Sequence, residues 1–74
     1  MAVAYMLIIT EVGEEHDAAK EILKINGVND VTVTYGAWDL VVKVSADSLP
    51  ALDGVVTKIR RLPFVKETST LIGK

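Results

Sequence analysis

The segment VAYMLIITEV, residues 3–12, is apolar on both faces that a β-strand would present. It is rich in β-branched and aromatic residues and ends at Gly13, which predicts a strand. Its apolar residues divide between the two faces as Val3, Tyr5, Leu7 and Ile9 against Ala4, Met6, Ile8 and Val12. A strand of this kind has to be covered on both sides. One face can meet helices of the same chain, and the other needs another subunit.

The small size of the chain also favours self-association. It has 74 residues and no cysteine. Domains below roughly 70 to 80 residues rarely gain more than about 3 to 5 kcal/mol from their own core, and usually add disulfides, a metal or an oligomer interface. Disulfides are excluded. The single histidine, His16, stands beside Glu14, Glu15 and Asp17 at an acidic helix start, where a lone histidine is usually solvated and not a metal ligand. We therefore expect no metal and no cofactor, and an oligomer instead.

The net charge of the chain and its first residues indicate which partners are not expected. Lys and Arg number 8 against 10 Asp and Glu, for a formal net charge of −2. Nucleic-acid-binding modules usually carry a basic surface, so direct binding to nucleic acid is not expected. The opening apolar run is too short to span a membrane and lacks the basic flank and cleavage site of a signal peptide. We expect a cytoplasmic protein without membrane contacts.

The rest of the chain alternates between helix and strand patterns. Periodicity predicts a helix over 14–26, strands over 28–35 and 38–46 joined by Gly36 and Ala37, a helix over 48–62 and a strand over 64–72. Asp47 and Ser48 are the N-cap candidates of the second helix. The order predicts a ferredoxin-like α+β fold, βαββαβ, with an antiparallel four-stranded sheet and both helices on one face. One sheet face would then stay uncovered, so we expect a sheet-to-sheet homodimer.

The hairpin turn is the most informative candidate site. Its residues are Thr34, Tyr35, Gly36, Ala37, Trp38 and Asp39. Turn N–H groups can hold a carboxylate, a carboxylate side chain can hold an ammonium, and aromatic rings can exclude water from a small ligand. A local explanation also stands: Gly36 for a positive φ, the two aromatics as caps of the core, and Asp39 as an acceptor within the turn. The residues alone leave both interpretations open.

A second cluster, Thr68, Ser69 and Thr70, places three hydroxyls in the last predicted strand. Threonine is favoured in strands for structural reasons alone. Because neighbouring residues of a strand point to opposite faces, at least one hydroxyl must face the uncovered side of the sheet. A partner or ligand would lie there.

No arrangement of residues predicts catalysis. The chain has no cysteine nucleophile, and His16 is remote in sequence from any hydroxyl nucleophile. The glycines form neither a dinucleotide-binding motif nor a phosphate-binding loop. We expect a binding protein and not an enzyme.

Three stretches resemble the effector-binding domain of the Lrp/AsnC family of transcription regulators, the RAM domain. They are AYMLIITEVG, EILKINGVNDVTVTYGAWDLVVKV and KIRRLPFVKETSTLIG, which together cover essentially the whole chain. The turn Gly36-x-Trp38-Asp39 is the most specific element. Trp38 stands where the family more often has Tyr, and Phe64 stands where Gly usually precedes Val65.

The resemblance implies a βαββαβ fold that pairs through its sheets as a dimeric α/β barrel, with dimers often assembled into rings. It implies small effectors, typically amino acids, bound between dimers near the turn, with Thr68, Ser69 and Thr70 as neighbours of residues 34–39. A DNA-binding half would need about 50 to 60 further residues. We therefore expect one effector-binding domain over residues 1–74 that modulates transcription regulation, either alone or in mixed oligomers with full-length relatives.

Three other functions stay open. An ACT-type amino-acid-binding module usually places its ligand by a Gly-containing turn after the first strand, where Gly13 stands. A small dimeric α/β-barrel enzyme would need a His, Tyr or Arg between sheet and helices, whereas we expect His16 and Arg60 on helix surfaces. A purely structural assembly subunit would be indifferent to amino acids.

Overall fold

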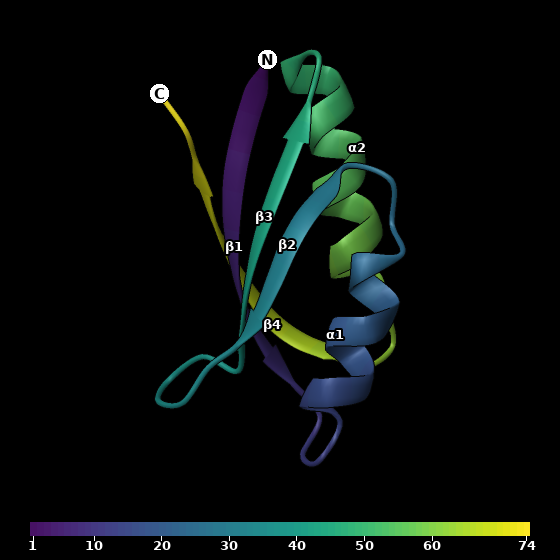
Figure 1. The fold of residues 1–74 in the computed structure, drawn as a ribbon, viewed down its shortest axis with the longest axis vertical. Coiled ribbons are helices and arrows are strands. Elements are labelled where there is room, and N and C mark those ends of the chain that lie inside the picture. Colours follow the sequence, from purple (N-terminus) through teal and green to yellow (C-terminus); the bar gives the residue numbers. More distant parts are fainter.

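The computed structural model describes all 74 residues. Its elements are β1 (Ala2–Thr10), α1 (Glu15–Leu23), β2 (Val28–Val33), β3 (Leu40–Ala46), α2 (Leu49–Arg60) and β4 (Val65–Ile72). The strands form one antiparallel sheet in the order β2-β3-β1-β4, and both helices lie on the same side of it (Figure 1). The predicted ferredoxin-like βαββαβ fold is confirmed.

The core lies between the sheet and the two helices. Its buried residues are Ala4, Met6, Ile8, Leu40, Val42 and Val44 from β1 and β3, and Ala18, Ile22, Leu52, Val56 and Ile59 from the helices. The strand residues alternate, and the helix residues are spaced by three or four, as each element's geometry requires. Each fully buried Leu, Ile or Met contributes about 1.5 to 3 kcal/mol relative to exposure.

The opposite face of the sheet has no cover within the protomer. We call it the open face and define it by Val3, Tyr5, Leu7, Ile9, Val41 and Leu71. In the sheet register, Leu7 pairs with Val41 of β3, and Tyr5 pairs with Leu71 of β4. All six side chains are half-buried or exposed. The prediction that β1 is apolar on two faces, one of them left uncovered by the helices, is therefore confirmed.

α2 begins where the sequence predicts. Ser48 is its N-cap, and the Ser48 side-chain oxygen accepts a hydrogen bond from the N–H of Ala51 at 3.2 Å. Lys58 and Arg60 lie in the last turn, where cations interact favourably with the helix dipole. Neither helix is long and apolar enough to cross a membrane.

Several predicted boundaries are wrong by a few residues. Val12 is not part of the first strand: β1 ends at Thr10, and Val12 is 98% exposed in the following loop. The first helix ends at Leu23, because the chain turns toward β2 through Gly27, whose φ is 103°. Trp38 precedes β3, because the hairpin loop spans residues 34–39 and not Gly36 and Ala37 alone.

Candidate functional site

Two loops at one end of the sheet border a single pocket of about 600 Å³. They are the β1–α1 loop, residues 11–14, and the β2–β3 loop, residues 34–39, both at the lower end of the molecule in Figure 1. Polar lining residues include Thr10, Glu11, Glu15, His16, Thr34 and Asp39. The volume is in the range of sites that hold small molecules.

Hydrogen bonds fix the shape of the β2–β3 loop. The N–H of Thr34 donates to the carbonyl of Asp39 at 2.8 Å, and the Thr34 hydroxyl donates to the carbonyl of Trp38 at 2.6 Å. Gly36 has a φ of 105°, which confirms its local role in the turn. The interpretation of Tyr35 as a cap of the core is wrong, because its side chain is fully exposed at the tip of the loop.

Asp39 joins this loop to the end of β1. Its Oδ2 accepts hydrogen bonds from the N–H and the hydroxyl of Thr10, at 2.9 and 3.4 Å. Its own N–H donates to the carbonyl of Ile8 at 2.8 Å. Thr10 is the one buried polar residue of the chain. The Asp39 side chain thus serves as an acceptor for β1 and not for its own turn, which corrects the local interpretation.

The second carboxylate oxygen of Asp39, Oδ1, is neither hydrogen-bonded nor fully buried. Oδ1 takes part in no hydrogen bond, while every buried side-chain oxygen and nitrogen of the protein has a partner. Oδ1 is therefore in contact with solvent, and Asp39 lines the pocket. A carboxylate held through one oxygen and exposed at the other is suited to receive an ammonium group.

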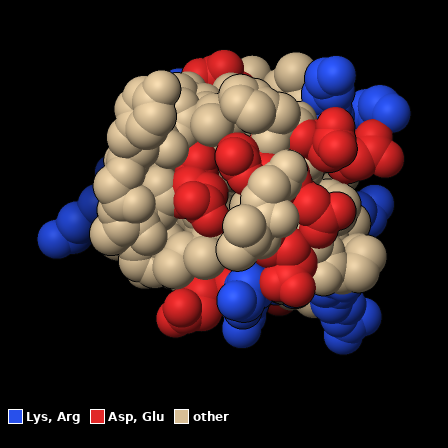
Figure 2. All heavy atoms as spheres, turned by 90° about the horizontal axis from the view of Figure 1, so that it is seen from below, with Lys and Arg blue, Asp and Glu red and all other residues tan.

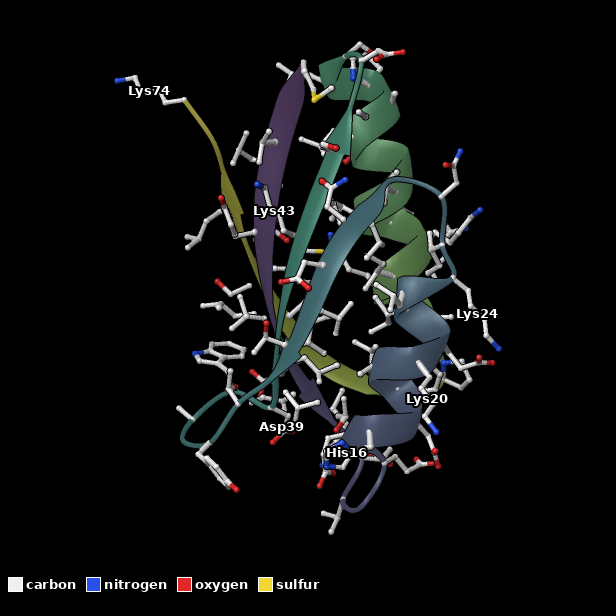
Figure 3. All side chains as sticks on the ribbon, in the orientation of Figure 1. His16, Lys20, Lys24, Asp39, Lys43 and Lys74 are labelled. Carbon is white, nitrogen blue, oxygen red and sulfur yellow. The ribbon has the colours of Figure 1, made fainter.

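α1 starts at the same pocket without a side-chain cap. Glu14 is its N-cap residue and makes no capping hydrogen bond. The N–H groups of Glu15, His16 and Asp17 also have no acceptor, whereas the N–H of Ala18 donates to the carbonyl of Glu14. Glu15 and His16 line the pocket, and Figure 3 shows His16 at the same end of the molecule as Asp39. Unpaired N–H groups at a helix N-terminus favour a carboxylate ligand.

The charge around the pocket is mostly negative. Glu11, Glu15 and Asp39 line it together with Lys66 and the single histidine. The Nζ of Lys66 lies 3.9 Å from the carboxylate of Glu11 in an exposed pair that contributes little. Figure 2 shows this end of the molecule with Asp and Glu near its middle and Lys and Arg mostly toward the rim. Such a field favours a ligand that carries a cationic group.

Residues 3–73 match the family described as the Lrp/AsnC ligand binding domain. The chain belongs to this family. FFRP-DM1, a solved structure, is 39% identical with a TM-score of 0.95, and the match covers 100% of both chains. The hypothetical protein PHS023 of Pyrococcus horikoshii is 39% identical with a TM-score of 0.94, over 100% of this chain and 90% of that one. AsnC of E. coli shares the fold, with 24% identity and a TM-score of 0.86 over 97% of this chain and 50% of AsnC.

Curated relatives of this Lrp/AsnC domain are longer proteins. An uncharacterized HTH-type transcriptional regulator of Pyrococcus abyssi is 33% identical over 60 residues, which are 80% of this chain and 40% of that protein. A second such regulator, from Pyrococcus horikoshii, is 32% identical over the same shares. The chain therefore spans about 40% of the length of the curated relatives it matches. The family is one of regulatory ligand-binding domains and not a known enzyme family.

Only part of the predicted site of this Lrp/AsnC domain comes together in one protomer. Thr34, Tyr35, Gly36 and Asp39 line the pocket, whereas Ala37 and Trp38 do not. Thr68, Ser69 and Thr70 lie on β4, which is separated from β2 by two strands. Their partners on β1 are Ile8, Leu7 and Met6 respectively, so Ser69 alone faces the open side. This confirms that at least one of the three hydroxyls is on that side.

The sequence did not predict Thr10, Glu11, Glu15 or His16 as lining residues of the Lrp/AsnC domain's pocket. Acids in a first helical turn usually complement the helix dipole, so Glu15 gave no distinct signal. Thr10 did offer one: it is a polar residue at the core-facing position that follows Ala4, Met6 and Ile8. His16 and Arg60 are exposed on the helices, as predicted. No three carboxylate or histidine residues gather closely enough to hold a metal ion.

Proposed function

We propose that this domain binds a free amino acid, or a similar zwitterion, in the pocket between the β1–α1 and β2–β3 loops. One observation carries the proposal: Asp39, whose Oδ1 makes no hydrogen bond, and Glu15 and His16, whose N–H groups have no acceptor, line the same pocket. An ammonium would pair with the carboxylate, and a carboxylate with the helix N-terminus. The family's description as a ligand binding domain supports this function.

The charges of the pocket suggest which amino acids bind. Three carboxylates and one lysine line it, so the field opposes a second negative charge on the ligand. We infer that the effector has a neutral or basic side chain and that aspartate and glutamate bind weakly. A plain carboxylate such as acetate, which lacks the ammonium, is not expected to bind. Ala37 and Trp38 belong to the β2–β3 loop but do not line the pocket.

We also propose that the open face pairs with the same face of a second copy. Its apolar side chains include Tyr5, which is 41% exposed, and Leu71, which is 55% exposed. Exposed apolar patches on small proteins mark interaction sites, and burial yields roughly 25 cal/mol per Å² of apolar surface. The family's tendency to oligomerise supports the pairing. The assembled domain would then modulate Lrp/AsnC-type regulators, alone or in mixed oligomers with full-length relatives.

Titration of the common amino acids into the purified protein tests the function. Trp38, the single tryptophan, lies next to Asp39 and reports by its emission, while light scattering follows the mass of the assembly. A saturable change with neutral or basic amino acids, and none with acetate, is expected. An assembly that responds to no amino acid would contradict effector binding and favour a structural subunit.

A further inference from the structure

We propose that Asp39 is a positioning residue as well as a ligand contact. It fastens the end of β1, and it thereby couples the pocket to the open face. The ligand contact rests on the proposed function, whereas the fastening of β1 is a property of the unliganded protein.

Asp39 makes hydrogen bonds to the β1 residues on either side of Ile9. Its N–H donates to the carbonyl of Ile8, and its Oδ2 accepts from the N–H of Thr10, at 2.8 and 2.9 Å. Ile9 lies between these two contacts. Its side chain alternates with the buried ones of Ile8 and Thr10 and therefore belongs to the open face.

Asp39 meets β1 where the pairing with β3 ends but the pairing with β4 continues. The register of β1 with β3 ends at the pair Ile8–Leu40, and its register with β4 shifts between Ile9 and Thr10. On the β4 side, Thr10 still pairs with Val65, and the N–H of Glu11 donates to the carbonyl of Phe64 at 3.0 Å. On the β3 side, Asp39 supplies a partner for the Thr10 N–H where the β1–β3 ladder no longer does, and so constrains that edge of the strand next to Ile9.

The two functions of the carboxylate require the same orientation. Oδ2 must point at Thr10 to fasten β1, which leaves Oδ1 without a hydrogen bond on a residue that lines the pocket. An ammonium bound at Oδ1 would restrict the side chain to this orientation and would strengthen the contact to Thr10. By linkage, an amino acid that binds the pocket should tighten pairing through the open face, and pairing should tighten its binding.

Three variants separate the two functions. Asp39→Asn keeps an amide oxygen that can accept from the Thr10 N–H but removes the charge that an ammonium needs. Asp39→Ala removes both. Asp53→Ala is the matched control, because Asp53 is exposed on α2 and lies outside this pocket.

Two readouts need no ligand: hydrogen exchange of the Thr10 amide by NMR, and the self-association constant by analytical ultracentrifugation. For Asp39→Ala we expect exchange about tenfold faster, the change expected for loss of one charge-assisted hydrogen bond. Association should weaken by at most the same factor, because the bond lies within one protomer and only part of its energy reaches the open face. Asp39→Asn keeps a neutral acceptor, so in both readouts it should lie closer to the wild type than Asp39→Ala does, but it should lose the Trp38 response to amino acids. Asp53→Ala should match the wild type in all three.

Exchange at Thr10 that is no faster in Asp39→Ala than in Asp53→Ala would overturn the fastening of β1. Faster exchange with unchanged association, or a wild type that does not associate, would overturn the coupling to the open face. Should Asp39→Ala fail to fold, Asp39→Glu displaces the carboxylate by one methylene, and the same outcomes apply to it. If the wild type shows no response to amino acids but both ligand-free results are as expected, the proposed function is contradicted. The role of Asp39 in holding the end of β1 is then unaffected.

Discussion

Gly27 stands where the fold leaves no room for a side chain. A Cβ at this position would lie 2.8 Å from Cγ2 of Val55 and 3.3 Å from the carbonyl oxygen of Ser45, and φ is +103°. Gly13 also has a positive φ, of +81°, but its surroundings are empty. The two glycines therefore share the backbone requirement, and Gly27 alone adds a packing requirement between the loop before β2 and α2.

Replacement of each glycine by alanine separates these requirements. Gly13→Ala should cost about 1 to 2 kcal/mol of unfolding free energy, because of the left-handed backbone alone. Gly27→Ala should cost about 1 to 3 kcal/mol more, because of overpacking against Val55. Urea denaturation measures both values. Equal losses would show that Val55 moves aside without cost.

Thr34 closes the β2–β3 loop through its hydroxyl. Thr34→Val keeps the shape of the side chain and removes the 2.6 Å hydrogen bond to the carbonyl of Trp38, so the unfolding free energy should fall by about 1 kcal/mol. Thr32→Val is the control, because the Thr32 hydroxyl makes only an exposed 3.5 Å contact with Asp30. Denaturation that is monitored by Trp38 emission should separate the two variants. Identical midpoints would contradict a structural role for the Thr34 hydroxyl.

At the scale of elements, α2 depends on the cap at Ser48. Ser48→Ala should lower the unfolding free energy by about 1 kcal/mol, because the N–H of Ala51 loses its side-chain acceptor. Ser69→Ala, on the open face and without a side-chain hydrogen bond, is the control. Thermal unfolding followed by circular dichroism measures the difference. A Tm for Ser48→Ala no lower than that of Ser69→Ala would contradict the capping role.

The centres of all six elements could be predicted from the sequence, and so could the start of β2 and the ends of β3 and β4, but several other ends could not. Side-chain periodicity identifies the buried faces: Met6, Val42 and Ile59 recur with the period of their strand or helix and lie in the core. The end of β1 is decided by a register shift against β4, and the start of β3 by the bond between Thr34 and Asp39. These backbone contacts join residues that belong to different segments of the chain. The hydrophobic pattern within one strand or helix carries no information about them.

At the scale of the whole molecule, the sequence predicted the residues that the β2–β3 loop contributes to the pocket, but not those from β1 and α1. Asp39 was identified through its turn motif, whereas Thr10, which fastens it, lies 29 residues away in the sequence. The α1 N–H groups were not predicted, because their availability depends on the missing side-chain cap at Glu14. Thr68, Ser69 and Thr70 were grouped with the turn only through the family resemblance, and a single protomer keeps them apart from it.

The open face gives a prediction about assembly. Leu7 lies on its central apolar strand, so Leu7→Lys should place a charge in the interface and weaken self-association at least about tenfold, since burying an unpaired charge costs well over 1.4 kcal/mol. Leu23→Lys changes an exposed leucine on α1, away from the open face, and serves as the control. Analytical ultracentrifugation measures both. Equal association by the two variants would show that copies of the chain do not pair through this face.

The most direct test of effector binding is to map the backbone amides by NMR while adding an amino acid that changes the Trp38 emission. The proposed pocket predicts the largest shifts at the amides of Glu15, His16 and Asp17 and at that of Thr10, which reports on Asp39. Asp39→Asn should abolish these shifts. Shifts confined to the open face or to β4, with the amides at the start of α1 unchanged, would contradict the proposed site.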